Sequence, residues 1–236
     1  MIFGDLVKLY EEKKTKYGKD AYRHVSELFQ EAKSRHREEY LGRPATKKKQ
    51  AQGKEVDPDQ AWRAFKGKNF EKLILHILSD EISSLGLKCT TDKSLDKKRL
   101  SEELSKVRRN LVVHYGKYDV LPDTDIIIYD PKMSEIIGVI SCKITLRERI
   151  AQTAYWKLKL AADPVTEQIK VFFVTTDEDG HLVKSLENAA APKGFKNRII
   201  VEHEFDGTYV LRRIEESENV KMFDKFIEDL RKLLRR

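Results

Sequence analysis

The chain has 236 residues, enough to bury a sizeable core in one large domain or in one domain with an appendage. Its 46 basic and 39 acidic residues give a net charge of +7, and such a balance favours a polyanion as partner. No apolar run is long enough to span a membrane, and the first five residues lack the charged and apolar regions of a signal peptide. Cys89 and Cys142 show neither metal-ligand spacing nor a disulfide framework, so we expect a soluble protein of the reducing cytoplasm.

Helical spacing dominates the N-terminal third of the chain. Apolar residues recur every three or four positions between residues 5 and 40, which predicts two amphipathic helices. Residues 42–54 are polar and rich in glycine and lysine, which predicts a loop that is either a solvated linker or an arm that wraps DNA. A further helix is predicted after Asp57, and residues 67–78 within it share an apolar face. Glu71 lies at the edge of that face, where the helix dipole alone would also favour a carboxylate.

Two short runs of apolar, mostly β-branched residues occupy the centre of the sequence, at 125–130 and 137–143. Asp and Pro between them have the composition of a turn, so the runs are predicted to form adjacent antiparallel strands. That pairing would bring Asp125, at the start of one strand, close to Lys143, at the end of the other. Charged groups in such positions are rarely buried without a partner.

The other predicted elements complete a layered fold. In chain order they are a charged helix at 94–109, short strands at 110–114 and 118–121, a helix at 147–162, a strand at 169–175, a hairpin formed by 198–204 and 208–212, and a closing helix at 220–234. Strands flanked by helices indicate an α/β or α+β sandwich.

The chemistry open to the central strands is metal-assisted hydrolysis of a phosphodiester. Asp125 and a second acid would hold Mg2+, a cation that prefers oxygen ligands, and the backbone carbonyl of Cys142 would add another oxygen. Lys143 would stabilise negative charge on the phosphate or orient the attacking water. The sequence contains no zinc spacing, Walker loop, dinucleotide-binding glycines or nucleophile elbow.

Asp125 before one strand and Lys143 at the end of the next resemble the PD-(D/E)xK nuclease superfamily. The triplet Ser141-Cys142-Lys143 has serine where many members carry an acid. Ser-x-Lys followed by Arg147-Glu148-Arg149 is similar to the type II restriction endonucleases that cut CCGG-containing sites, a group that includes BsaWI and NgoMIV. The resemblance covers residues 67–159 and is sharpest at 125–149.

The resemblance implies a PD-(D/E)xK core, with a mixed central sheet flanked by helices, at residues 67–236. Residues 1–66 would be a helical extension, with its basic loop, used for dimerisation and DNA contacts. The implied protein is a homodimeric, Mg2+-dependent hydrolase, with Mn2+ able to substitute, that cuts double-stranded DNA at a short palindromic CCGG or interrupted CC/GG site. It would belong to a prokaryotic restriction-modification system with a cognate DNA methyltransferase.

Members of this group have serine in place of the acid before the lysine and usually carry an acid on the following helix instead. Residues 153–157 of this chain contain no acid. Glu71 is the expected replacement, because a glutamate beside an aromatic residue on an N-terminal helix recurs in the superfamily. The expected catalytic residues are Asp125, Lys143, Glu71 and Ser141. The second metal-binding acid stays open between Glu71 and Asp123.

The Arg147-Glu148-Arg149 triplet suits the reading of G·C pairs. Arginine donors match guanine O6 and N7, and a carboxylate accepts from cytosine N4, so each arginine would hold one guanine while Glu148 bridges two cytosines. An exposed, salt-bridged turn is the structural alternative. Two other functions remain open: a PD-(D/E)xK repair or junction nuclease that recognises DNA shape, and a DNA-binding relative without metal or catalysis.

Overall fold

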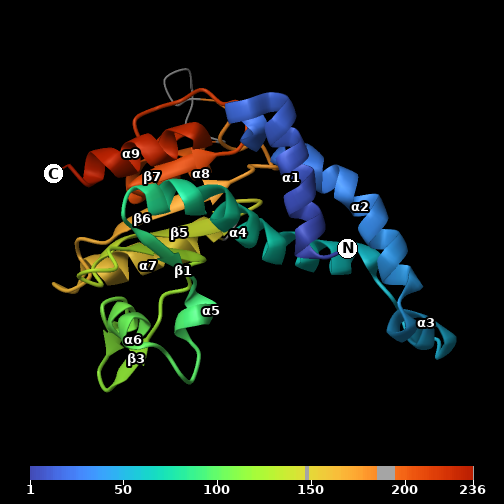
Figure 1. The fold of residues 1–236 in the computed structure, drawn as a ribbon, viewed down its shortest axis with the longest axis horizontal. Helices are drawn as coiled ribbons and strands as arrows, with labels where there is room; N and C mark the ends of the chain where they lie inside the picture. The colour runs from blue at the N-terminus through green and yellow to red at the C-terminus, as the bar shows by residue number, and fades with distance from the viewer. Residues whose placement is uncertain (147–148, 185–194, 236) are drawn as a thin grey trace. The chain divides into compact units, whose positions relative to one another are not determined.

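The computed structural model describes residues 1–146, 149–184 and 195–235 (Figure 1). The chain forms two compact units, Met1–Leu73 and Ile74–Arg236. Among the described residues, no helix combines the length and the apolar character needed to cross a membrane.

The first unit is helical. It contains α1 (Phe3–Tyr17), the 3-10 helix η1 (Gly18–His24), α2 (Val25–Gly42), α3 (Pro44–Ala51) and the first part of α4 (Pro58–Ser84). Its core includes Leu6 and Leu28, both fully buried, and Phe29 packs edge-to-face against Trp62 and Phe70. The helices predicted between residues 5 and 40 are confirmed as α1 and α2.

The loop predicted at residues 42–54 is wrong for most of its length, because Pro44–Ala51 form the helix α3. Pro44 occupies the first turn, where a missing N–H costs no intrahelical bond and the fixed φ favours the helix. The alanine, lysine and glutamine residues that follow have high helix propensity. The glycine and lysine content of the segment therefore led to the prediction of a loop where a helix begins.

The second unit is built on a mixed sheet with the strand order β1-β4-β5-β6-β7-β8. The strands are β1 (Lys88–Thr90), β4 (Ile126–Tyr129), β5 (Ile136–Lys143), β6 (Lys170–Thr175), β7 (Gly207–Val210) and β8 (Val220–Met222). β1, β4 and β5 pair antiparallel, whereas β5, β6, β7 and β8 pair parallel. The predicted mixed sheet is confirmed, and β5 is the strand at which the direction of pairing changes.

Helices cover both faces of this sheet. On one face, α7 (Arg149–Ala161) and α8 (Lys196–Glu204) join a core that contains Val139 and Phe173. On the other, Phe226 of α9 (Phe226–Leu233) packs edge-to-face on Phe172 and Tyr209, with ring centroids 5.4 and 5.0 Å apart. Phe172 and Phe173 point to opposite faces because side chains alternate along a strand. The predicted arrangement of a sheet flanked by helices is confirmed, and α7 and α9 lie in segments that were predicted to be helical.

A small insertion separates β1 from β4. It contains α5 (Asp92–Leu95), α6 (Glu102–Arg109) and a hairpin of β2 (Val113–Tyr115) and β3 (Tyr118–Val120). Ser101 caps α6, since its hydroxyl accepts from the backbone N–H of Leu104 at 3.2 Å. The two short strands predicted in this region are confirmed, but the single helix predicted at 94–109 is wrong, because residues 96–101 between α5 and α6 are not helical.

The hairpin predicted at 198–212 is wrong. Residues 196–204 form α8, and β7 runs parallel to β6. The run Arg198-Ile-Ile-Val201 has the β-branched composition of a strand, but the buried residues of α8 are Arg198, Val201 and Glu202, at the spacing of three and four that one side of a helix has. Packing against the sheet therefore overrides the local propensity.

The closing helix predicted at 220–234 is shorter than expected. Val220–Met222 form β8, the 3-10 helix η3 (Phe223–Lys225) follows, and α9 begins only at Phe226. Val220 pairs with Thr208, so the first residues of the predicted helix instead complete the parallel edge of the sheet.

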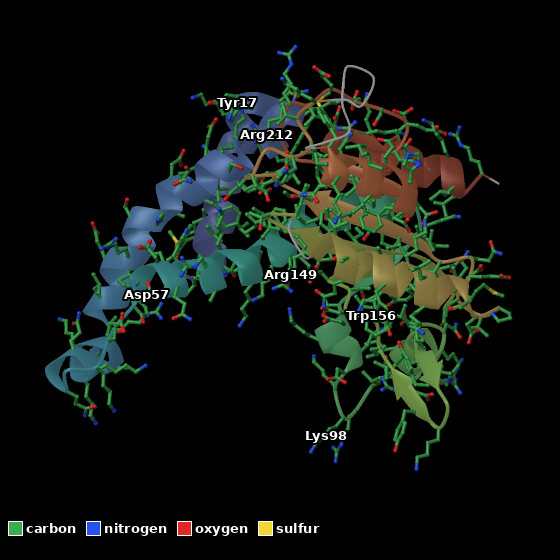
Figure 2. All side chains as sticks on the ribbon, turned by 180° about the vertical axis from the view of Figure 1, so that it is seen from behind. Tyr17, Asp57, Lys98, Arg149, Trp156 and Arg212 are labelled. Atoms are coloured by element: carbon green, nitrogen blue, oxygen red, sulfur yellow. The ribbon has the colours of Figure 1, made fainter. Side chains whose placement is uncertain are left out.

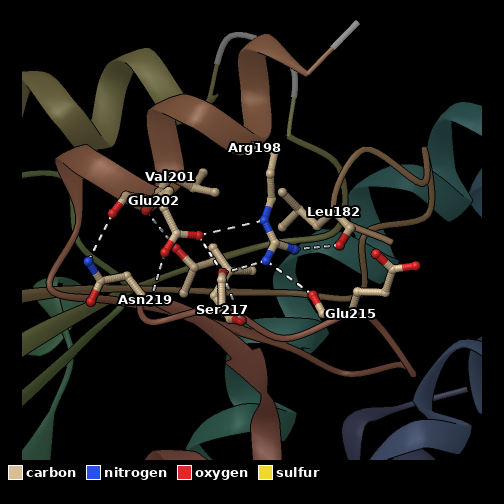
Figure 3. A network of polar contacts seen from close by, with 9 residues as sticks. Leu182, Arg198, Val201, Glu202, Glu215, Ser217 and Asn219 are labelled. Atoms are coloured by element: carbon tan, nitrogen blue, oxygen red, sulfur yellow. Dashed lines mark hydrogen bonds and ion pairs between the residues drawn. The ribbon is translucent and has the colours of Figure 1, made fainter. Parts of the chain in front are cut away.

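A buried arginine ties α8 to the segments around it (Figure 3). Arg198 is fully buried, and its guanidinium donates to the carbonyl oxygens of Leu182 at 2.8 Å and Glu215 at 3.1 Å. It also donates to the Ser217 hydroxyl, which in turn donates to the carboxylate of Glu202. Arg198 Nε lies 3.7 Å from Glu202 Oε2. One cation therefore binds two loop carbonyls and a carboxylate one turn further along the same helix.

Gly138 allows β5 and β6 to approach closely. A Cβ at this position would lie 2.8 Å from Phe172 Cε2 and 2.9 Å from the Lys170 carbonyl oxygen. We expect Gly138→Ala to lower the free energy of unfolding by about 1–3 kcal/mol, as overpacking does. Urea denaturation measures this change. In the control Gly67→Ala, the new methyl meets nothing within 4 Å inside α4, and the stability should rise by about 0.5–1 kcal/mol. A Gly138→Ala protein as stable as wild type would contradict the packing.

Candidate active site

Asp125 and Lys143 meet at one end of the sheet. Asp125 directly precedes β4 and Lys143 ends β5, and the pairing of Ile126 with Ile140 brings the two residues together. Lys143 Nζ donates to Asp125 Oδ2 at 2.8 Å. Asp125 is 5% exposed, so the ion pair is largely shielded from water. The predicted proximity of the two side chains is confirmed.

The backbone of β5 also contacts the Asp125 carboxylate. The N–H of Cys142 donates to Oδ2 at 2.6 Å. In an antiparallel ladder the N–H and the carbonyl of one residue point to the same side of the strand, so the Cys142 carbonyl also faces the side on which Asp125 lies. A carboxylate and a carbonyl oxygen are thus brought to the same end of the sheet.

The charges around Lys143 keep it protonated. Burial by itself would lower the pKa of this lysine, but the charge of Asp125, its hydrogen bond and the charge of Asp123 outweigh burial and raise the pKa above its usual value. Lys143 therefore acts as a cation and hydrogen-bond donor in this position.

A further carboxylate near this end of the sheet escaped the sequence analysis. Asp92 begins α5, two residues after Thr90, which pairs with Ile127 of β4. Burial raises the pKa of Asp92, and the charges of Asp125 and Asp123 add to that shift. In the sequence, Asp92 is marked only by the three-residue strand that precedes it. The pairing of that strand with β4 is what places Asp92 near Asp125. No group of three or more His, Cys, Asp or Glu side chains in the described ranges is arranged to hold a metal ion.

Asp123 is joined to α7. The side-chain amide of Gln152 donates to Asp123 Oδ2 and, through its oxygen, accepts from Arg149 Nη1 at 3.3 Å. Arg149 begins α7 and is exposed, and Figure 2 shows it together with Trp156, which lies further along the same helix. The structure thus places the last arginine of the predicted recognition triplet in a chain of polar contacts that ends two residues before Asp125.

Ser141 faces α7. It is buried, and its Oγ lies 3.1 Å from the Thr153 hydroxyl, which also donates to the Arg149 carbonyl at 3.2 Å. Its contacts fix the position of α7 on β5. A direct part of Ser141 in catalysis stays a prediction.

The segment between β5 and α7 is anchored to the loop after β6. The N–H of Leu146 donates to Asp179 Oδ2 at 3.3 Å, and the carbonyl of Ile144 accepts from the N–H of Glu178 at 3.2 Å. These bonds determine where the chain leaves Lys143 and approaches Arg149.

Three predicted site residues are not placed relative to this pair. Arg147 and Glu148 lie outside the described residues. Glu71 is half-buried in α4 and belongs to the first unit, whereas Asp125 belongs to the second. The roles of these three residues stay predictions.

Comparisons with known proteins identify the family of this chain. The sequence model of the BsaWI type 2 restriction endonuclease family matches residues 103–233. A Methanocaldococcus jannaschii protein that carries the name type II restriction enzyme MjaVIP is 40% identical over 215 residues, which cover 88% of this chain and 92% of the relative. A Helicobacter pylori protein with the name type II restriction enzyme HpyAORF263P is 44% identical over 118 residues, which cover 49% of this chain and 60% of the relative.

The fold also resembles a solved restriction endonuclease. The structure of the PspGI–substrate DNA complex aligns with a TM-score of 0.52 and 15% sequence identity, over 98% of this chain and 93% of that one. At this identity the likeness concerns the fold alone. The match of the family model to more than half of the chain, with 40% identity to a relative along nearly its full length, shows that the chain belongs to the BsaWI family of type II restriction endonucleases, which are site-specific nucleases.

Proposed function

We propose that the protein is a homodimeric, Mg2+-dependent restriction endonuclease that hydrolyses double-stranded DNA at a short palindromic CCGG-type or interrupted CC/GG site. The observation that carries the proposal is the buried Lys143–Asp125 pair, followed after a short segment by a helix with Arg149 exposed at its start. The similar fold of PspGI, whose structure contains substrate DNA, supports DNA as the substrate.

The oxygen atoms beside Lys143 fit Mg2+. This cation binds to one or two carboxylates, keeps several waters and takes further oxygens from the substrate phosphate. Asp125 and the Cys142 carbonyl would hold it, with Asp123 or Glu71 as the second acid. Both hydrogen bonds described for the Asp125 carboxylate end on Oδ2, so Oδ1 would be the oxygen that holds the cation. A bound Mg2+ supplies Lewis acidity that polarises the phosphate and lowers the pKa of a water ligand, and Mn2+ suits the same oxygens.

Lys143 would act directly on the scissile phosphate. One of its ammonium hydrogens is held by Asp125, which fixes the direction of the remaining donors. In hydrolysis the oxygen of water forms a bond to phosphorus, the bond from phosphorus to the leaving oxygen breaks, and negative charge grows on the phosphate oxygens. A fixed ammonium donor stabilises that charge without having to reorganise.

Sequence recognition is assigned to the segment that joins β5 to α7. Arg147 and Arg149 would each bind one guanine in the major groove, and Glu148 would accept from two cytosines. A twofold-related subunit would read the other half of a palindrome. Lys47, Lys48 and Lys49, all exposed on α3, would contact phosphates and make the affinity salt-dependent.

The proposed activity also implies a partner enzyme. A nuclease that cuts a short site would destroy the DNA of its own cell, so a DNA methyltransferase must modify the same site. We place both enzymes in the cytoplasm of a prokaryote, where that DNA lies.

The arginine contacts can be tested one at a time. We expect Arg147→Ala and Arg149→Ala each to weaken discrimination between a CCGG site and a site with one altered core guanine by about 1–3 kcal/mol, the contribution of one bidentate contact. Binding titrations with the two duplexes measure this ratio. Arg213→Ala removes the same charge from an exposed position outside α7 and should leave the ratio unchanged. Intact discrimination in both test variants would argue against the assigned contacts.

The function is tested by digesting a fully sequenced plasmid with purified protein in Mg2+, in Mn2+ and in a chelator, and mapping every fragment end. Discrete cuts that share a CCGG-like core and require the cation support the proposal. Cuts at branches or ends would instead identify a structure-specific nuclease. Tight binding in Mg2+ without cutting would identify a non-catalytic relative.

A further inference from the structure

Gln152 bridges a residue of the recognition triplet and an acid beside the active site. Its oxygen Oε1 accepts from Arg149 Nη1 at 3.3 Å, and its nitrogen Nε2 donates to Asp123 Oδ2. A side-chain amide carries an acceptor and donors on one planar group. It can therefore hold a cation at one atom and an anion at the other, whereas a carboxylate or an ammonium can hold only one of them.

The positions of Arg149 and Asp123 show which parts of the chain Gln152 connects. Arg149 lies three residues before Gln152 on α7, on the same side of the helix. Asp123 lies two residues before Asp125, in the segment that leads into β4. The amide thus connects the side chain proposed to read a guanine with the segment that carries Asp125.

We propose that Gln152 is a positioning residue that couples recognition of a guanine by Arg149 to the placement of Asp123 at the active site. The inference rests on the proposed function. Arginine has several N–H donors in a fixed planar arrangement, so Nη1 can stay on Gln152 while the other edge of the guanidinium binds guanine O6 and N7.

A correct guanine stabilises this one orientation of Arg149. Because the amide is rigid, the same orientation stabilises the contact between Gln152 and Asp123. A wrong base leaves Arg149 without that restraint, so the Asp123 contact gains nothing.

The test compares Gln152→Leu, which removes both contacts, with Gln152→Glu, which keeps an acceptor for Arg149 but sets a negative charge against Asp123. Single-turnover cleavage rates are measured on a cognate duplex and on a duplex with one altered core guanine. Dissociation constants for both duplexes are measured in the Lys143→Ala background, where cleavage does not interfere. Gln168→Leu, at an exposed position between α7 and β6, is the matched control.

We expect both Gln152 variants to cut the cognate duplex about 10- to 100-fold more slowly, the range for the loss of one hydrogen bond to a charged group. The cognate dissociation constant should change by less than about threefold, since the other base and phosphate contacts remain. Cleavage of the altered duplex should stay constant, so the ratio of the two rates falls. A merely structural role in α7 would instead lower both rates together.

A double-mutant cycle of Gln152→Leu with Arg149→Ala completes the test. Coupled residues give a combined effect on the cognate rate smaller than the sum of the single effects, and strict additivity overturns the inference. If the wild type cuts at discrete sites but Gln152→Leu and Gln152→Glu leave the ratio of the two cleavage rates unchanged, the coupling alone is overturned. A wild type that makes no site-specific cuts overturns the proposed function and the coupling with it.

Discussion

Lys143→Ala is expected to cut cognate DNA at least about 10²–10³ times more slowly than wild type, the loss found on removing one fixed donor to a developing negative charge. The ammonium of Lys143 is held by Asp125 at 2.8 Å and is mostly buried, so no water molecule replaces it with the same charge or direction. Binding to the cognate site should be retained, because the proposed base contacts come from residues beyond β5. Single-turnover cleavage and a binding titration separate the two effects.

A lysine at the other end of the neighbouring strand provides the control. Lys170 begins β6, and its Nζ lies 3.6 Å from Asp206 Oδ1, so Lys170→Ala also removes one lysine from an ion pair at the end of a central strand. The Lys170→Ala protein should cleave cognate DNA at the wild-type rate. Thermal unfolding of both variants shows whether each is folded. A folded Lys143→Ala protein that cleaves at the normal rate would remove Lys143 from the mechanism.

Arg198→Met should lower the free energy of unfolding by about 3–5 kcal/mol, the effect of removing one partner of a buried ion pair. The Glu202 carboxylate would remain in its largely buried position without its cation, and the carbonyl oxygens of Leu182 and Glu215 would lose their donor (Figure 3). Urea denaturation followed by circular dichroism measures the loss.

A second substitution distinguishes the lost charge pair from simple misfit of the new side chain. In Arg198→Met/Glu202→Gln the carboxylate is no longer charged, so part of the lost stability should return. The exposed Arg213→Ala should stay within about 0.5 kcal/mol of wild type. If Arg198→Met were equally mild, the buried network would not contribute the stability that its contacts imply.

Local sequence was sufficient to predict the centre of the fold. Two β-branched runs joined by a short turn have few ways to pair, and the resulting antiparallel register brings Asp125 to Lys143. Apolar residues recur at helical spacing along residues 149–161, and this pattern likewise predicted α7. These elements share one property: neighbours in the sequence are also neighbours in space.

The misread elements depend on distant contacts. Arg198-Ile-Ile-Val201 is helical because α8 buries one side against the sheet, and the Arg198 cation finds its partners in segments up to nineteen residues away. Asp92 comes near Asp125 only through the pairing of β1 with β4, which no local pattern of three residues reveals.

The double pairing of β5 has a consequence for how such enzymes diversify. β5 is bonded along its length to an antiparallel and a parallel neighbour, and a shift of one residue would turn Lys143 to the opposite face of the sheet. Insertions and deletions within β5 are therefore incompatible with hydrolysis. Exposed positions on α7 carry no such constraint. Directed evolution towards new target sites should confine its library to these helix positions and leave the strand unchanged.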